Sequence, residues 1–251
     1  MLQKQEFSGG IVLYCGDCLE IMPSLDLTVD MVLNDPPYGT TKNHWDCVVP
    51  YEEMWANLNR LAKINAAMCF FSAQPFATDL IQSNRAAFRY DLVWEKTLAV
   101  GFLNANRMPL RNHELILMFY RELPDYFPQK TAGTPYVSTG RSGGHSTNYG
   151  KFDPVPIHNE SGDRHPVSVW KCSIDSDRQH PTQKPVPLLK RLILSYTQEG
   201  EMVLDFTMGS GSAAVACVET KRKFVGIERE AKYFDIACER VERAAAQGVL
   251  F

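Results

Sequence analysis

The tetrapeptide 35–38, Asp-Pro-Pro-Tyr, combines a carboxylate, two rings that lack a backbone N–H and an aromatic side chain. It follows the apolar run 29–33, and because two prolines cannot continue a central strand, it must lie in the loop past that strand's end. An exocyclic base amine is a poor nucleophile, since its lone pair is delocalised into the ring. A carboxylate and a backbone carbonyl that accept its two N–H bonds would bias the nitrogen toward tetrahedral geometry, while Tyr38 would stack on an extruded base.

A second candidate lies at residues 203–212, Val-Leu-Asp-Phe-Thr-Met-Gly-Ser-Gly-Ser. A strand, a glycine turn and a helix start let the backbone approach a ligand closely and offer it unpaired N–H groups. The next apolar run ends at Glu228, where the ribose hydroxyls of a nucleotide would lie. Asp205 opens the turn and could hold the amino group of an amino-acid moiety. The third glycine typical of dehydrogenases is missing, which disfavours a nicotinamide.

The elements that must position these residues alternate along the chain. Apolar periodicity and turn residues predict strands over 11–14, 29–33, 66–72, 92–95, 115–119, 202–204 and 224–227. They predict helices over 18–25, 51–63, 75–83, 187–197, 212–220 and 232–246. The alternation predicts an α/β fold with a doubly wound, mostly parallel sheet, and 251 residues suit one domain, 1–251.

The amino-acid composition argues against a membrane-spanning or secreted protein. No stretch approaches the roughly 20 apolar residues of a membrane span, and the first residues lack the apolar core of a secretory signal. The seven cysteines are scattered, which fits a reducing compartment, so we expect a cytoplasmic protein. Cys15 and Cys18 form a C-x-x-C pair without a second pair or matching histidines, so we expect a structural role and no metal.

Positive charge gathers in the middle of the chain. The net charge is −3, yet residues 89–151 carry eight basic and five acidic side chains. Such a segment permits a surface that faces phosphates, although a solvated basic face would have the same composition. Residues 131–150 are dominated by Gly, Ser, Thr and Asn, and so long a loop is either functional or disordered.

Four motifs occur in a recognisable order: Gly16-Asp17-Cys18-Leu19, the tetrapeptide 35–38, the hexapeptide 180–185 (His-Pro-Thr-Gln-Lys-Pro) and the glycine turn. Together, and in this order, they resemble the amino-methylating DNA methyltransferases of the permuted β-class, most closely the compact phage or prophage-type enzymes. The matches span residues 16 to 228. The family usually has Asp-Pro-Phe-x-Gly-Ser-Gly at the turn, whereas this chain has Asp-Phe-Thr-Met-Gly-Ser-Gly at 205–211. The aromatic residue is displaced by one position, so the motif does not specify which side chain covers the cofactor.

The resemblance implies a Rossmann-like fold that uses S-adenosylmethionine and releases S-adenosylhomocysteine. It implies that Asp17 contacts the cofactor adenine and that Thr182 and Lys184 contact the methionine carboxylate. The implied catalytic residues are Asp35, Pro36, Pro37 and Tyr38. The implied cofactor-binding residues are Asp17, Cys18, Thr182, Lys184, Asp205, Phe206, Thr207, Gly209, Ser210, Gly211 and Glu228.

The implied reaction is site-specific methylation of adenine N6 in double-stranded DNA, in a protein associated with the nucleoid. We expect an inserted target-recognition region over about 104–171. The candidate DNA contacts are Arg107, Arg111, Arg121, Arg141 and Lys151. A homodimer and a cognate restriction endonuclease are the further partners that the class suggests.

Other functions compete with this interpretation. Cytosine N4 methylation is the nearest, because the same pocket serves either amine, but members that act on cytosine more often have Ser in place of Asp35. RNA or protein-glutamine methylation usually goes with Asn there and with the unpermuted order. A dehydrogenase leaves residues 35–38 without a role. A non-catalytic DNA-binding relative is disfavoured, because catalytic and cofactor residues are both intact.

Overall fold

The computed structural model describes residues 3–40, 46–138, 144–146, 150–152, 157–173 and 183–248, with only the backbone of 144–146, 150–152 and 248. It divides into two compact units, Met1–Phe127 with Ser168–Phe251, and Pro128–Val167. No helix in the described part of the chain combines the length and the apolar character that crossing a membrane requires.

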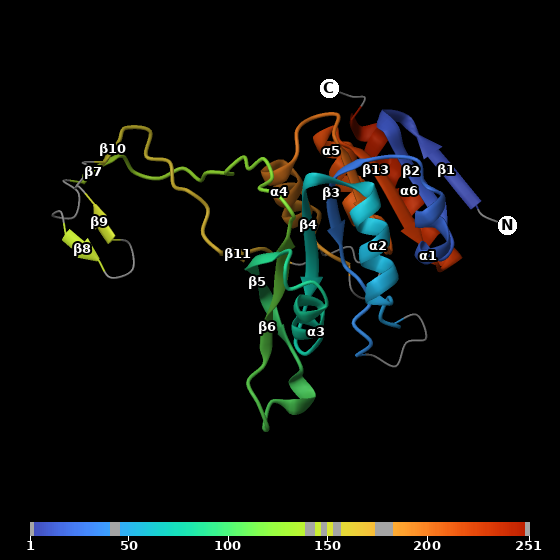
Figure 1. Cartoon of the computed structure of the whole chain (residues 1–251), viewed down its shortest axis with the longest axis horizontal. Helices are drawn as coiled ribbons and strands as arrows, with labels where there is room; N and C mark the ends of the chain where they lie inside the picture. The colour runs from blue at the N-terminus through green and yellow to red at the C-terminus, as the bar shows by residue number, and fades with distance from the viewer. Residues whose placement is uncertain are drawn as a thin grey trace. The chain divides into compact units, whose positions relative to one another are not determined.

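The first unit is built on a nine-stranded sheet, in the order β1-β2-β13-β12-β3-β4-β6-β5-β11 within the described residues (Figure 1). Its strands are β1 Gln3–Phe7, β2 Ile11–Cys15, β3 Val29–Asn34, β4 Ala62–Ser72, β5 Phe88–Val100, β6 Arg111–Phe119, β11 Val169–Lys171, β12 Met202–Asp205 and β13 Lys223–Glu228. Neighbours from β2 to β4 run parallel, whereas β1 and β6 run antiparallel to the strands beside them. The predicted mostly parallel α/β sheet is confirmed.

Helices cover both faces of this sheet. They are α1 Cys18–Ile21, α2 Tyr51–Leu61, α3 Phe76–Ser83, α4 Val186–Tyr196, α5 Ser212–Thr220 and α6 Ala231–Gly248, with short 3-10 turns η1 Ser8–Gly10, η2 Met22–Ser24 and η3 Phe102–Asn104. Met31 and Leu33 of β3 belong to the apolar cluster shared with α4, α5 and α6. Val32 belongs to the cluster shared with α1, α2 and α3. Burial on both faces explains why β3 has a continuous apolar sequence rather than an alternating one.

Strands β4 and β6 begin four residues earlier than predicted, the short strand β11 was not predicted, and two further strands differ more. The strand expected at 92–95 extends over 88–100, and it pairs with β6 in a long antiparallel hairpin whose end projects past β4 (Figure 1). The edge strand β1 was not predicted. Both stretches are largely exposed, so their side chains carry no apolar periodicity, and backbone pairing determines their conformation. The helix expected at 18–25 breaks into α1 and η2 at Pro23.

The second unit, 128–167, consists of antiparallel pairs. Strand β7 (Tyr136–Ser138) pairs with β10 (Ile157–Asn159), and β8 (Gly144–Ser146) pairs with β9 (Gly150–Phe152). The guanidinium of Arg164 donates to the carbonyl oxygen of Thr134 at 2.6 Å and lies 4.8 Å from the ring centroid of Tyr136. Of the predicted insertion 104–171, residues 104–127 and 168–171 belong to the first unit.

Candidate active site

The carboxyl ends of four adjacent parallel strands, β2, β13, β12 and β3, border a cavity of about 560 Å³. This is the edge of an open α/β sheet at which ligands bind. All four predicted catalytic residues line it. The predicted cofactor residues that line it are Asp17, Cys18, Lys184, Asp205, Phe206, Thr207, Gly209, Ser210 and Glu228. Gly211 does not line it, and Thr182 lies outside the described residues.

Gly211 serves the packing of the glycine turn. Its φ is 75°, and a Cβ added there would lie 2.8 Å from the Cβ of Ala237 on α6. From α6, the guanidinium of Arg240 donates to the carbonyl oxygen of Ser210 at 2.6 Å and to the hydroxyl of Ser212 at 3.0 Å. The turn is therefore fixed by α6 from behind, and this leaves its opposite side to the cavity.

Two buried carboxylates lie at the end of the cavity where the sequence predicts that a cofactor binds, which is termed the cofactor end. The Glu228 carboxylate accepts from the backbone N–H of Gly209 at 2.9 Å and of Glu230 at 2.8 Å. Asp205 Oδ1 accepts from Asn34 Nδ2 at 2.6 Å. Burial raises the pKa of Glu228 and raises that of Asp205 to about 7. A ligand that brought a cationic group to Asp205 would relieve this cost, as the ammonium of an amino-acid moiety would.

Asn34 and Thr207 connect the glycine turn to the tetrapeptide 35–38, and neither connection was predicted. The hydroxyl of Thr207 accepts from Asn34 Nδ2 at 2.9 Å and donates to the main-chain oxygen of Asp35 at 3.2 Å. Thr207 is one residue of the departure from the family's usual turn sequence. Asn34 could have been identified from the sequence. An amide at the end of a buried apolar strand is itself buried, and a buried amide needs polar partners.

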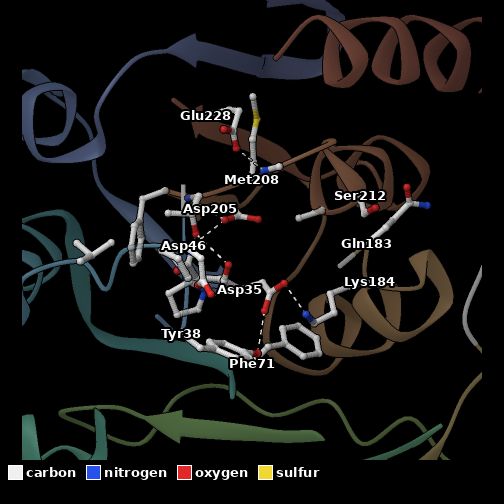
Figure 2. Close-up of a pocket in the computed structure, with 18 of the residues that line it drawn as sticks. Asp35, Tyr38, Asp46, Phe71, Gln183, Lys184, Asp205, Met208, Ser212 and Glu228 are labelled. Atoms are coloured by element: carbon white, nitrogen blue, oxygen red, sulfur yellow. Dashed lines mark hydrogen bonds and ion pairs between the residues drawn. The ribbon is translucent and has the colours of Figure 1, made fainter. Parts of the chain in front are cut away.

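Asp35 lies between two donors (Figure 2). Its Oδ1 accepts from the Tyr38 hydroxyl at 3.0 Å, and its Oδ2 accepts from the Lys184 ammonium. The Tyr38 ring stacks on Phe76, with ring centroids 5.0 Å apart and planes inclined by 22°. One face of Tyr38 is therefore covered by protein, so the predicted platform for a base would be limited to the other face.

Lys184 lies at the end of the cavity that contains the predicted catalytic residue Asp35, a position that the resemblance did not imply. Its Nζ contacts the Asp35 carboxylate and lies 3.4 Å from Glu114 Oε2, while Glu114 Oε1 accepts from Lys96. Burial would lower the pKa of Lys184, but the two carboxylates hold it above its ordinary value. Burial would likewise raise the pKa of Glu114, but Lys184 and Lys96 hold it below its ordinary value. For Asp35, burial raises the pKa and Lys184 opposes the rise.

Glu114 and Lys96 could not be identified as site residues from the sequence. They lie on the antiparallel strands β6 and β5, where Glu95 pairs with His113 and Trp94 with Glu114. Because no motif surrounds them, only the pairing of these strands beside β4 reveals that they line the cavity.

The predicted DNA contacts have different surroundings. Arg107 and Arg111 are exposed at the end of the β5–β6 hairpin. The guanidinium of Arg121 donates to the carbonyl oxygens of Asn59, Ala62 and Lys63, at 3.1, 2.6 and 3.0 Å, and so holds the connection between α2 and β4. Arg141 and the side chain of Lys151 lie outside the described residues. Among described residues no cluster of three metal-binding side chains occurs, and Cys15 and Cys18 are free thiols.

Known proteins resemble this chain over most of its length. The family model N6_N4_Mtase, described as DNA methylase, matches residues 29–239. The DNA adenine methyltransferase YhdJ of Escherichia coli is 27% identical over 92% of this chain and 82% of its own length. Type II methyltransferase M2.MboI of Moraxella bovis is 24% identical over 91% of this chain and 86% of its own length.

Solved structures agree on the fold. The complex of M1.HpyAVI with SAM superposes with a TM-score of 0.62 at 23% identity, over 91% of this chain and 98% of that one. The cytosine-N4-specific PvuII DNA methyltransferase gives a TM-score of 0.65 at 14% identity, over 93% and 89% of the two chains. At such identities the likeness bears on the architecture, which is that of DNA methyltransferases.

Proposed function

Because the chain belongs to the N6_N4_Mtase family of DNA methylases, we propose that it transfers a methyl group from S-adenosylmethionine to adenine N6 in double-stranded DNA. The observation that carries this proposal is a single cavity that contains both the side chains suited to a base amine and those suited to a cofactor. Asp35 and Tyr38 line one end, and the buried carboxylates of Asp205 and Glu228 line the other. A methyl donor and a base amine could therefore meet inside it.

The cofactor end fits S-adenosylmethionine, which supplies an electrophilic methyl group on its sulfonium sulfur. Asp205, with its pKa raised by burial, would pair with the amino group of the methionine moiety. Each Glu228 oxygen accepts one backbone N–H and keeps a lone pair for a ribose hydroxyl. Asp17 caps α1 by accepting from the N–H of Leu19 at 2.8 Å, which holds its carboxylate at the cavity for the adenine.

The chain's catalytic work is to position the amine. Asp35 and the carbonyl of Pro36 accept the two N–H bonds of an extruded adenine, and the proton leaves after the displacement. Lys184 keeps Asp35 in its anionic, accepting form, and Glu114 holds Lys184 in place. Fixing two bound reactants in line can contribute roughly 7–11 kcal/mol to lowering a barrier.

Adenine is favoured over cytosine by the carboxylate at position 35 and by the similarity to a protein named as an adenine methyltransferase. Cytosine N4 remains the alternative, because the fold is shared with a cytosine-N4-specific enzyme. The order of the motifs favours the permuted β-class, of phage or prophage type. A homodimer, a cognate restriction endonuclease and a place in the cytoplasm at the nucleoid are further parts of the proposal, carried over from the class.

The product identifies the reaction. Purified protein is incubated with unmethylated DNA and S-adenosylmethionine carrying a labelled methyl group, and the digested nucleosides are analysed by mass spectrometry. The proposal predicts labelled N6-methyladenine. Labelled N4-methylcytosine would keep the mechanism and overturn the base assignment, and the absence of any labelled nucleoside would contradict the function.

A further inference from the structure

The end of the β5–β6 hairpin presents large apolar side chains to solvent. Phe102 is 80% exposed and Leu103 is 97% exposed, and they are adjacent in η3. Leu98 and Val100 precede them and are 61% and 50% exposed, and Met108 follows them and is 58% exposed. Exposed apolar patches of this kind are unfavourable in water and mark sites at which another molecule binds.

Backbone hydrogen bonds give this end a defined shape. Gly101 adopts a left-handed φ of 93°, and its carbonyl oxygen accepts from the N–H of Asn104 at 2.9 Å. The carbonyl oxygen of Asn104 then accepts from the N–H groups of Arg107 and Met108, at 2.8 and 3.0 Å. Two successive turns therefore present Phe102 and Leu103 on an ordered support, which reduces the entropy lost when they insert elsewhere.

The charges around these two side chains indicate a polyanionic partner. No acidic residue occurs between Glu95 and Glu114, whereas the same stretch contains the exposed side chains of Arg107 and Arg111. A protein partner that covered an apolar patch would not require this bias. A nucleic acid offers both features at once, since apolar base faces lie between rows of phosphates.

The hairpin also projects from the correct edge of the sheet. Strand β5 is antiparallel to β6, which is antiparallel to β4, so β5 ends at the same edge as β3 and its tetrapeptide 35–38. Leu98 and Val100 line the cavity that contains Asp35. Phe102 and Leu103 therefore follow the apolar residues of the cavity wall in the chain, separated from Val100 only by Gly101.

We propose that Phe102 and Leu103 form a wedge that enters the base stack beside the target nucleotide and holds open the space that the extruded base leaves. The inference rests on the proposed function and adds a cause for the extrusion. Unstacking a base step with an apolar wedge costs free energy, which new contacts between protein and DNA offset. The basic side chains nearby can supply such contacts along the DNA backbone.

The test compares the double variant Phe102→Ala/Leu103→Ala with wild type on two duplex oligonucleotides. Both carry the site that wild type methylates, and one has an abasic position opposite the target base, which removes its pairing partner. Leu123→Ala is the matched control, because Leu123 is 78% exposed but follows the other end of β6. Melting temperature and affinity for S-adenosylhomocysteine verify that the fold and cofactor site are intact.

We expect the double variant to lose about tenfold or more in kcat/KM on the paired duplex and about twofold or less on the abasic duplex, because only the former must be opened. An equal loss on both duplexes would assign the hairpin to general DNA binding and overturn the wedge, as would no loss on either. A wild-type dimer that the double variant dissociates would overturn it too. Wild-type turnover on the paired duplex reports on the proposed function alone, and the ratio between duplexes reports on the wedge.

Discussion

At the scale of single residues, the site is organised by a row of largely buried charges of alternating sign: Lys96, Glu114, Lys184 and Asp35. Each would be costly alone in this environment, because removing a partner leaves an uncompensated buried charge. The row places a permanent cation against the carboxylate proposed to accept from the substrate amine. Its purpose, on this account, is to keep Asp35 ionised and oriented.

Lys184→Met should therefore impair the chemical step rather than only the fold. We expect kcat to fall by about 10²–10³-fold, the loss typical of removing one electrostatic contact from an active site. Because the opposing cation is gone, the pKa of Asp35 should rise further, and the acidic limb of the kcat profile should move to higher pH. The control is Lys190→Met, which removes an exposed ion pair with Glu219. An unshifted pH profile would contradict the role.

Asp205 predicts a pH dependence of cofactor binding. Its folded-state pKa of about 7 lies above the ordinary 3.8, so the folded protein binds this proton more tightly than the unfolded chain. The unliganded protein should thus lose stability as the pH rises from about 4 to about 7, while affinity for S-adenosylhomocysteine should increase toward pH 8 as the carboxylate ionises.

Calorimetric titration between pH 6 and pH 8 measures that affinity. In Asp205→Asn it should be weaker and nearly independent of pH over this range. A wild-type affinity that does not change with pH would show that Asp205 does not hold the amino group.

Single residues at the ends of apolar runs could be predicted from the sequence. Asp35, Asp205 and Glu228 were found in this way, because the carboxyl ends of parallel strands converge on one edge of the sheet. The partners of these residues could not be predicted. Asp35 and Lys184 are 149 positions apart, and only the packed sheet decides that their side chains meet.

At the scale of elements, the turn between β12 and α5 depends on the contact between α5 and α6. Gly211 combines a positive φ with a neighbour, Ala237, that leaves no room for a Cβ. The glycine pattern predicted a ligand site, and Gly209 and Ser210 line the cavity, but the packing role of Gly211 follows only from the position of α6.

Gly211→Ala should destabilise the protein by strain and by overpacking, about 1–2 kcal/mol for the left-handed conformation and about 1–3 kcal/mol for the clash. Gly200→Ala isolates the first effect, because Gly200 has φ 82° and nothing within 4 Å of an added Cβ. Urea denaturation measures both. Equal losses in the two variants would show that α6 does not constrain the turn.

The β5–β6 hairpin shows the limit of pattern-based prediction for elements. Strand β5 continues beyond the predicted strand to Val100, although residues 97–100 are exposed, and Val100 pairs with Arg111 after an irregularity that begins at Glu95. Side-chain periodicity reports burial, and a projecting hairpin has little burial to report.

At the scale of the whole molecule, chemistry and recognition are proposed to reside in different parts of the chain. The cavity belongs to the first unit, and residues 128–167 form the second. The change in composition at 131–150 predicted a long loop, either functional or disordered, and the short strands of this unit could not be predicted, since short polar strands lack any apolar period.

The double variant Arg141→Ala/Lys151→Ala tests this separation. Affinity for S-adenosylhomocysteine should be unchanged, while affinity for duplex DNA should fall and its salt dependence should weaken by about one to two counterions. Filter-binding assays over a range of salt concentrations measure this. Unchanged DNA affinity and site choice would remove the support for a recognition role of this region.

The central claim is that this family member methylates DNA through Asp35, and single-turnover transfer of labelled methyl groups to unmethylated DNA tests it most directly. Wild type should label adenine, and Asp35→Ala should slow the transfer by about 10³-fold or more while S-adenosylhomocysteine binds with nearly unchanged affinity. Transfer by Asp35→Ala at the wild-type rate, with cofactor bound, would contradict the account.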